Sequence, residues 1–474
     1  MSQIPPIVTE LARHVRGAGG RAMLNGGCVR DPLLDPPQDS KDWDLEIYGI
    51  EPGTLRGLLE RFAALHPEAS PLNVVGEAFA VYKLGQHLDV SLPRRERKSG
   101  SGHRAFVVEG DADMSFEEAC KRRDFTINAI LKDPLTDEVV DPFDGRGDIG
   151  RRLLRMVSQE TFAEDSLRVL RAAQFAARFA FEVEPATAQV CSKIDPTDLA
   201  RERIWGELEK LLLKAERPSI GLQLLYDWGS VAQLFPELQS LVGVPQEPEW
   251  HPEGNVDIHT TMVLDEARKL IGDLDHARQV AVMLGALCHD LGKPPTTEFI
   301  DGRTRSRGHD EAGVEPTISL LDRLGIYTLD GFDVREQVIQ LVRYHLLPGE
   351  WYKSMQKGQP VGDGAFRRLA RKVEMDLLYR VAKADSLGRN PDWLPPEKRF
   401  GSEAQEWFID QVHSLSVEKS APRPILMGRH LIEMGMEPGP DFKSILDAVY
   451  EMQMDGEVVD LDGALAAARR LGSE

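Results

Sequence analysis

The amino-acid sequence predicts an α+β protein, in which a head with a small mixed β-sheet is followed by a long and almost entirely helical remainder. In the first third, helical stretches alternate with short runs of strand-forming residues, at 22–24, 43–48, 72–75, 79–84 and 87–92. From about Leu153 onward, apolar residues recur at helical spacing nearly throughout. A chain of 474 residues is also long for a single hydrophobic core, so we expect two to four domains.

The composition is typical of a globular protein and limits the classes of function. Hydrophobic residues make up 42% and charged residues 28% of the chain. The net charge of −20 argues against a protein that coats polyanions in general, but it leaves nucleic acid open as a partner. Basic residues gather in three runs within the first third, which are either solvated surface or a local phosphate-binding face: 94–104, 121–123 and 146–155.

Four widely spaced cysteines without a CxxC pair indicate buried thiols in a reducing compartment. The first residues lack the basic-then-apolar pattern of a signal peptide. No apolar run approaches the ~20 residues that a membrane span needs. We therefore expect a cytoplasmic protein that does not contact a membrane.

The stretch from Gly26 to Glu46 carries the first candidate site. A Gly-Gly turn closes the apolar run at 22–24 and lets backbone N–H groups approach a phosphate. The following DWDLEIY is typical of a strand, on which Asp42 and Asp44 point the same way because side chains alternate between faces. Two adjacent carboxylates suit Mg²⁺ with substrate phosphates as its remaining ligands, whereas the alternative is a solvated edge strand.

Asp89 is an acidic residue within the apolar strand HLDVSL. It is either an edge residue with its carboxylate in water or a third carboxylate on a strand beside Asp42 and Asp44. Nucleotidyl transfer needs such a third group, because two metal ions require more than two protein ligands.

Residues 161–179 predict a helix with Glu164 and Asp165 at its N-terminal end. Asp165, Arg168 and Arg171 then follow at i, i+3 and i+6, so consecutive members are neighbours on the helix surface. The plain interpretation is an exposed salt bridge. The alternative is a base reader, because an aspartate accepts from an exocyclic amine while an arginine donates to ring acceptors.

Histidine and aspartate residues recur between 259 and 385. His259 precedes a His289-Asp290 pair at the end of an apolar helix, and Asp385 follows much later. A single buried histidine is usually structural, but this set has the composition of a site for Mn, Ni, Fe or Zn. His309 and His345 lie between these residues.

These pieces, in this order, resemble the bacterial class II CCA-adding tRNA nucleotidyltransferases of the polymerase β-like superfamily. The matching motifs are GGCVRD with DWD (26–44), KSGSGHRAF (98–106), KRRDFTINAI (121–130), DPFDGRGDI (141–149), EDSLRVLRAAQFAARF (164–179) and RERIWGELEKLL (201–212). Residues 259–385 look like the metal-dependent HD phosphohydrolase domain that one branch of this family carries. The resemblance implies addition of CCA to the 3′ end of tRNA from CTP and ATP.

The resemblance also implies roles for residues of the head and the following helix. Asp42 and Asp44 would hold two Mg²⁺ ions, and Asp89 would orient or deprotonate the tRNA 3′-hydroxyl. The residues implied in nucleotide binding are Gly27 and Arg30 for the triphosphate, Arg123 for the incoming nucleotide, Asn128 for its sugar or the local turn, Asp165 and Arg168 for the base edge, and Arg171 for stacking or phosphate.

In the HD region, the resemblance implies that His259, His289, Asp290 and Asp385 bind Ni²⁺, Mn²⁺ or another divalent transition metal. His309 and His345 would be further ligands or phosphate contacts. The implied activity is that of a phosphatase or 2′,3′-cyclic phosphodiesterase on phosphate-ended RNA.

The family pattern divides the chain into four predicted parts: a catalytic head (1–153), a nucleotide-selecting neck with a tRNA-binding body (154–245), the HD domain (246–395) and a C-terminal helical region (396–474). One departure concerns Gln174, where the family commonly has an arginine. Loss of that cation puts a contact with nucleotide or tRNA phosphate in doubt.

Alternatives remain open at this point: an enzyme that adds only CC or only A, a poly(A) polymerase, an RNA-binding protein with inactive centres, or a protein whose main activity lies in its HD domain. The sequence does not indicate an oligomeric state.

Overall fold

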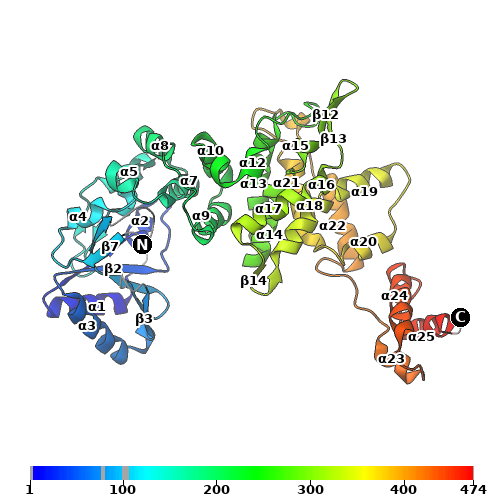
Figure 1. The fold of residues 1–474 in the computed structure, drawn as a ribbon, viewed down its shortest axis with the longest axis horizontal. Coiled ribbons are helices and arrows are strands. Elements are labelled where there is room, and N and C mark those ends of the chain that lie inside the picture. The colour runs from blue at the N-terminus through cyan, green and yellow to red at the C-terminus, as the bar shows by residue number, and fades with distance from the viewer. Residues whose placement is uncertain (1–3, 76–80, 99–105, 473–474) are drawn as a thin grey trace. The chain divides into compact units, whose positions relative to one another are not determined.

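A computed structural model describes residues 4–75, 81–98 and 106–472. The chain divides into two compact units (Figure 1), Met1–Glu207 with Leu224–Leu234 and Leu208–Gln223 with Phe235–Glu474. Most of the motif KSGSGHRAF (98–106) lies outside the described residues.

The first unit contains a mixed sheet with the strand order β3-β4-β5-β2-β1-β8-β9. Its central pair, β2 and β5, is parallel, and all other neighbouring strands are antiparallel. The predicted small mixed sheet is therefore confirmed. The strands are β1 (Arg21–Asn25), β2 (Trp43–Tyr48), β3 (Leu72–Val75), β4 (Val81–Leu84), β5 (Leu88–Ser91), β8 (Leu131–Lys132) and β9 (Val139–Val140).

Two amphipathic helices, α1 (Pro6–Gly17) and α3 (Pro52–Leu65), lie side by side against this sheet (Figure 1). Their apolar faces are fully buried, at Leu11 and Val15 of α1 and Leu55 and Leu59 of α3. Packing of these apolar faces against the sheet removes them from water, and this burial stabilises the head. The remaining elements of the head are α2 (Gly27–Arg30), β6 (Arg94–Lys98), β7 (Phe106–Gly110), α4 (Phe116–Lys121) and α5 (Gly145–Arg151), with single 3₁₀ turns at Asp31–Leu33, Pro67–Ala69 and Thr126–Asn128.

The helix predicted over 161–179 is interrupted. A short helix α6 (Gln159–Phe162) ends before Glu164, and α7 begins only at Leu167 and continues to Phe179. The reason is local: the Asp165 carboxylate accepts a hydrogen bond from the N–H of Leu167, so Asp165 lies in the turn that precedes α7. The elements that follow are β10 (Leu153–Leu154), β11 (Glu182–Val183), α8 (Pro185–Cys191), α9 (Arg201–Lys214), α10 (Pro218–Asp227) and α11 (Ser230–Leu234).

The second unit is built around α14 (His276–Cys288), on which almost every residue from Ala277 to Cys288 is buried. It packs against α13 (Val256–Lys269), α18 (Val334–Tyr344) and α21 (Met375–Leu387), as Figure 1 shows. The other elements of this part are α12 (Pro236–Gln239), α15 (Lys293–Thr296), β12 (Thr297–Ile300), β13 (Arg303–Ser306), α16 (His309–Ala312), α17 (Val314–Leu324), β14 (Thr328–Leu329), β15 (Phe332–Asp333), α19 (Leu347–Gln356), α20 (Asp363–Leu369), a 3₁₀ turn (Pro396–Lys398) and α22 (Glu403–Leu415).

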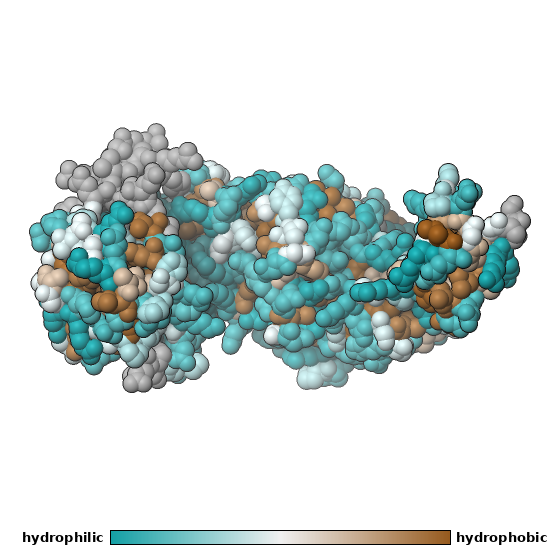
Figure 2. Space-filling view, turned by 90° about the horizontal axis from the view of Figure 1, so that it is seen from below, coloured by the Kyte–Doolittle hydropathy of each residue, from teal (hydrophilic) through white to brown (hydrophobic). Residues whose placement is uncertain are grey.

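The last three helices, α23 (Gly428–Glu433), α24 (Pro440–Met454) and α25 (Leu461–Leu471), enclose a small core of their own. It includes Leu431, Val449 and Ala464. Figure 2 shows hydrophilic residues over most of the visible face, with hydrophobic residues gathered on these helices.

All four cysteines are free and buried, as the sequence predicts. Among the described residues, every helix is too short or too polar to cross a lipid bilayer.

Candidate active sites

The parallel pairing of β2 with β5 brings two of the three predicted carboxylates together. Asp44 lies directly opposite Asp89, and Asp42 is two residues before Asp44, just ahead of β2. The other two carboxylates each have a nitrogen partner: Lys83 Nζ donates to Asp89 Oδ2 at 3.1 Å, and His87 Nδ1 lies 3.0 Å from Asp42 Oδ1.

Asp44 is the least favourably placed of the three. Burial and repulsion from Asp89 raise its pKa to about 6, although Arg123 counteracts them. Within the part of the chain that the structure describes, the groups of three His, Cys, Asp or Glu whose ligand atoms lie within 4.8 Å of one another all belong to the second unit. The three head carboxylates are adjacent but less tightly gathered. A half-buried carboxylate that is repelled by its neighbours fits a divalent cation.

The Gly-Gly turn approaches this cluster closely. Gly26 has φ +67°, and a Cβ atom added there would lie 3.3 Å from Asp44 Oδ2. Gly27 opens α2 directly after it. The turn therefore brings backbone to the edge of the carboxylates with no side chain in between.

The Arg30 guanidinium contacts other protein side chains, whereas the sequence predicts that it contacts a triphosphate. Its buried guanidinium donates to Asp31 Oδ1 (2.7 Å) and Asn128 Oδ1 (2.5 Å) and stacks on the rings of Phe175 and Phe179. Arg30 is thus a packing residue in this conformation, and contact with a triphosphate remains an untested prediction.

Asn128 continues the same buried network. Its amide donates to Asp124 Oδ1 at 3.0 Å, and Asp124 is also paired with Arg171 at 2.6 Å. Of the two roles expected for Asn128, this geometry corresponds to the local turn.

A cavity of about 430 Å³ joins the remaining nucleotide-binding candidates. Its wall contains six arginines but only three acidic residues, an excess of positive charge that suits a polyanion such as a triphosphate. The charged lining residues are Arg94, Arg122, Arg123, Arg168, Arg171, Arg203, Glu46, Asp124 and Asp165.

Asp165 has a partner that the sequence pattern does not indicate. Arg203 Nη2, from α9, lies 3.1 and 2.8 Å from the two oxygens of Asp165. Arg168 donates to the backbone carbonyls of Thr161 (2.6 Å) and Arg122 (2.7 Å). Arg123 is half-buried and lies 3.5 Å from Glu46. The predicted base readers are therefore held by residues from outside α7.

Gln174 is 1% exposed, and its amide oxygen and nitrogen have no hydrogen-bond partner in the structure as described. A side chain buried in this way cannot contact a nucleotide or tRNA phosphate. Gln174 is not among the residues that line the cavity.

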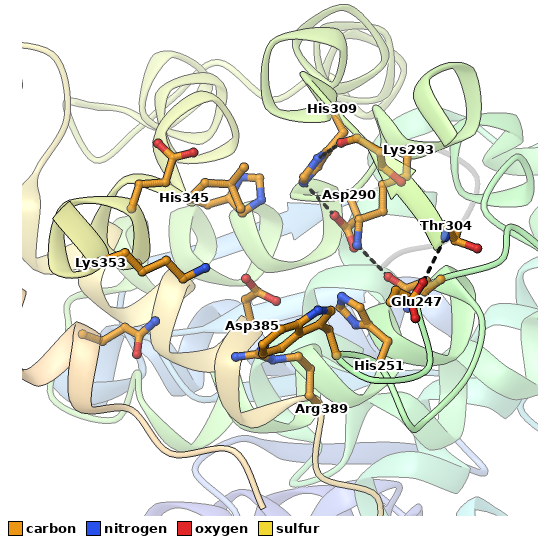
Figure 3. Close-up of a pocket in the computed structure, with 17 residues that line it drawn as sticks. Glu247, His251, Asp290, Lys293, Thr304, His309, His345, Lys353, Asp385 and Arg389 are labelled. Carbon is orange, nitrogen blue, oxygen red and sulfur yellow. Dashed lines mark hydrogen bonds and ion pairs between the residues drawn. The ribbon is translucent and has the colours of Figure 1, made fainter. Parts of the chain in front are cut away.

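In the second unit, four of the predicted HD residues, Asp290, His309, His345 and Asp385, line one pocket (Figure 3), and His259 and His289 lie against the two aspartates. His259 Nε2 lies 3.0 Å from Asp385 Oδ1 and 3.9 Å from Asp290 Oδ2. His289 Nε2 lies 3.2 Å from the same oxygen of Asp290. His259 comes from α13, His289 and Asp290 directly follow α14, and Asp385 comes from α21, so residues up to 126 positions apart in the chain meet here.

His309 and His345 join the same centre. His309 Nε2 is 3.4 Å from Asp290 Oδ1, the other oxygen of that carboxylate. The Nδ1 atoms of His289, His309 and His345 lie 2.6–2.8 Å from the carbonyl oxygens of Ala286, Ser306 and Val342, respectively. Each ring is therefore oriented with Nε2 directed away from its own backbone, as in metal sites.

The six side chains form two adjoining ligand groups: His259, His289 and Asp385, and Asp290, His309 and His345. The Nε2 atom of His345 is buried without a hydrogen-bond partner among the described residues. Burial, together with nearby His309 and His289, lowers the pKa of His345 to about 4, which keeps the imidazole neutral and able to ligate. These donors fit a divalent transition metal.

Comparisons with known proteins identify the parts of the chain in which both candidate sites lie. The family described as "Poly A polymerase head domain" matches residues 22–155, "Probable RNA and SrmB- binding site of polymerase A" matches 180–241, and "HD domain" matches 256–390. The Multifunctional CCA protein of Xanthomonas campestris pv. campestris is 37% identical over 380 residues, which cover 77% of this chain and 85% of that protein. This chain belongs to the multifunctional CCA protein family.

Other similarities agree with this membership. The Multifunctional CCA protein of Stenotrophomonas maltophilia is 41% identical over 315 residues, which cover 64% of this chain and 71% of that protein. The crystal structure of the Bacillus stearothermophilus CCA-adding enzyme in complex with CTP has a TM-score of 0.61 and 22% identity, and the match covers 99% of this chain and 98% of that one. This structural likeness confirms the expected fold.

Local sequence patterns do not indicate every residue at these sites. Arg203 lies within the motif at 201–212, so its position was known but its contact with Asp165 was not. Lys293, three residues after Asp290 in HDLGK, lies 2.8 Å from Asp290 Oδ2. Glu253 lies 2.7 Å from His259 Nδ1 and 2.9 Å from His251 Nδ1, and no spacing rule predicts it.

Proposed function

We propose that this chain adds CCA to the 3′ end of tRNA, using CTP and ATP. The observation that supports this proposal most strongly is that one unit contains both the Asp44–Asp89 pair and an arginine-lined cavity with Asp165 in its wall. Membership of the multifunctional CCA protein family supports the same reaction.

In the proposed mechanism, Asp42 and Asp44 hold Mg²⁺, which when bound supplies positive charge to the triphosphate. Asp89, positioned by Lys83, orients the tRNA 3′-hydroxyl and accepts its proton. The hydroxyl oxygen bonds to the α-phosphorus as the bond to the leaving pyrophosphate breaks. Arginines of the cavity, among them Arg123 and Arg171, bind the phosphates.

Asp165 and Arg168 account for the choice of base. Cytosine and adenine both carry an exocyclic amine next to a ring nitrogen that accepts a hydrogen bond, whereas uracil and guanine present a carbonyl oxygen at the equivalent place. A carboxylate accepts from the amine and a guanidinium donates to the ring nitrogen. One pair of side chains therefore serves both CTP and ATP and rejects UTP and GTP.

A nucleotide-addition assay tests this function. With tRNA that lacks its 3′ end, CTP alone should add two residues, and CTP with ATP should complete the CCA end. Asp44→Asn should abolish incorporation, while Asp113→Asn, a change at an exposed carboxylate of the same unit, should not. Incorporation of only C or only A from the mixture would instead indicate a partial-adding enzyme.

We also propose that the HD site hydrolyses phosphate monoesters or 2′,3′-cyclic phosphates with Ni²⁺, Mn²⁺ or a related divalent metal. Such a metal, when bound by the six converging ligands, makes a water molecule more acidic at neutral pH. Lys293 lies beside Asp290 and balances part of the carboxylate charge. Asp290→Asn should abolish phosphate release and leave CCA addition unchanged. Loss of both activities would contradict this assignment.

The four-part division at 153, 245 and 395 remains a proposal. The matched segments 22–155, 180–241 and 256–390 lie close to these boundaries and support them.

A further inference from the structure

An exposed tryptophan lines the HD pocket without a visible structural purpose. The Trp250 side chain belongs to the pocket wall, yet the residue is 48% exposed. In the ranges that the structure describes, no aromatic ring or side-chain cation stacks on its indole. Large aromatic side chains gain free energy from burial, so an open indole face inside a polar pocket suits an incoming planar group.

The backbone around Trp250 is fixed on both sides. The N–H of Trp250 donates to the Glu247 carbonyl at 3.0 Å, and the Glu247 carboxylate accepts from the N–H of Thr304 on β13 at 3.0 Å. The neighbouring Glu249 is paired with Arg303 at 2.9 Å. The indole is thus presented to the pocket by an anchored turn, so little conformational entropy is lost when a ligand stacks on it.

Two cations enter the same pocket from other elements. Lys353 comes from α19, and Arg389 follows α21. Figure 3 shows the Lys353 side chain extending toward His345 and Asp385, with Arg389 on the other side of Asp385. Arg389 is held by Ser386, whose hydroxyl accepts a hydrogen bond at 2.7 Å. Together with Lys293, these cations make the pocket attractive to a phosphate.

We propose that the HD pocket selects a phosphate carried by a nucleoside, with Trp250 stacking on the base while Lys353 and Arg389 bind the phosphate. The pocket volume of about 400 Å³ exceeds the needs of a phosphate group alone. This inference rests on the phosphohydrolase function proposed above. It adds the residue that distinguishes the end of an RNA from a small phosphate ester.

Steady-state hydrolysis of two substrates tests the stacking role. Trp250→Ala should raise KM for adenosine 3′-monophosphate by about tenfold or more, as expected for loss of one base–aromatic stack. It should leave hydrolysis of glycerol 2-phosphate, which has no base, unchanged. Trp250→Phe should restore most of the affinity. Trp393→Ala, at a tryptophan that is 67% exposed and outside the pocket, is the matched control.

Equal impairment of both substrates in Trp250→Ala would overturn the inference, because it would show a structural role. An unchanged KM for both would do the same. Lys353→Ala should raise KM for both substrates, since both carry the phosphate, whereas Lys357→Ala, one turn away and exposed, should not.

A binding measurement without metal separates this inference from the hydrolase proposal. Adenosine 3′-monophosphate should quench part of the tryptophan fluorescence of the metal-free full-length protein, and the quenching should be absent in Trp250→Ala. If the wild type hydrolyses neither substrate with any divalent metal, the proposed hydrolase function fails while quenching still decides the stacking. Quenching that persists in Trp250→Ala would refute the stacking itself.

Discussion

At the scale of single residues, the proposed base-reading site depends on side chains that position one another. Asp165 lies in a turn, and the N–H of Leu167 holds only one oxygen of its carboxylate. Arg203 fixes both oxygens from a different helix. Rigid placement of this kind matters because a template-free enzyme has only its own side chains with which to recognise a base.

Arg203→Ala should therefore damage selectivity more than chemistry. We expect kcat/KM for CTP and ATP to fall about tenfold and discrimination against UTP to weaken. Without Arg203, the Asp165 carboxylate is no longer fixed in the position from which it accepts a hydrogen bond from the exocyclic amine. Kinetics with each triphosphate measure this. Arg201→Ala, which removes an exposed arginine paired with Glu202, is the control and should leave all three values unchanged. Unaltered selectivity in Arg203→Ala would contradict the positioning role.

Asp124 links stability to pH. Burial alone would raise its pKa, but the ion pair with Arg171 and hydrogen bonds from Asn128 and the Phe125 N–H outweigh burial and hold the pKa below its usual value. A carboxyl with a lowered pKa stabilises the folded state fully above its unfolded pKa, about 4, and loses that contribution as the pH falls through the folded value.

Urea unfolding between pH 6 and pH 3.5 should show this dependence. The unfolding free energy of the wild type should fall more steeply below about pH 4 than that of Asp124→Asn, which cannot titrate at this position. Parallel slopes for the two proteins would show that Asp124 does not contribute to the acid sensitivity.

At the scale of elements, the HD site depends on a close crossing of two short segments. A Cβ atom at Gly292, which begins α15, would overlap the carbonyl of His309 and the backbone nitrogen of Gly313 at the two ends of α16. Because position 292 has no side chain, α16 can lie directly against it. This placement of α16 brings His309 close to the other predicted metal ligands.

Gly292→Ala should push α16 away and weaken the ligand group of Asp290, His309 and His345. We expect a loss of about 1–3 kcal/mol in unfolding free energy from the overpacking and a reduced number of Ni²⁺ ions bound. Calorimetry and metal titration measure these effects. Gly272→Ala, at a glycine with no atoms near the added Cβ, should behave as the wild type. Normal metal binding by Gly292→Ala would refute the argument.

Helix α7 contains a polar residue for which its surroundings provide no partner. Gln174 is buried with both amide atoms unpaired among the described residues, a condition that costs free energy. Gln174→Leu, which removes these atoms with little change in volume, should raise the unfolding free energy by about 1 kcal/mol. CCA addition should be unchanged, because the side chain does not reach the cavity. A loss of addition with normal stability would show that the amide acts on the substrate.

At the scale of the whole molecule, two candidate metal sites of different chemistry lie in two compact units. The predicted ligands in the head are carboxylates, which suit Mg²⁺, whereas those of the HD site are four histidines and two aspartates, which suit transition metals. The two activities should therefore respond differently to metal exchange.

After chelation and dialysis of the full-length protein, Mg²⁺ alone should restore CCA addition but leave phosphate release absent. Addition of Ni²⁺ or Mn²⁺ should then restore phosphate release. His289→Ala, which removes one HD ligand, should regain addition with Mg²⁺ and remain inactive in phosphate release with every metal. Restoration of both activities by Mg²⁺ alone would contradict the assignment of different metals.

The sequence by itself determined much of this protein, because the relevant signals are local. The period-two pattern around Asp42 and Asp44 indicates a strand, the helical spacing after Leu153 indicates an all-helical remainder, and the family motifs indicate the reaction. Even so, local spacing placed Asp165 on a helix, whereas a side-chain hydrogen bond to Leu167 places it in the turn before α7.

Only the tertiary structure decided which of these residues meet. Asp44 faces Asp89 because β2 and β5 pair in parallel, Arg203 reaches Asp165 across 38 residues, and Asp290 presents one oxygen toward His289 and the other toward His309. The tertiary structure also places the Arg30 guanidinium over the rings of Phe175 and Phe179. Such contacts form when distant segments are packed to exclude water, and the packing of the whole chain, which no short window of sequence contains, sets their geometry.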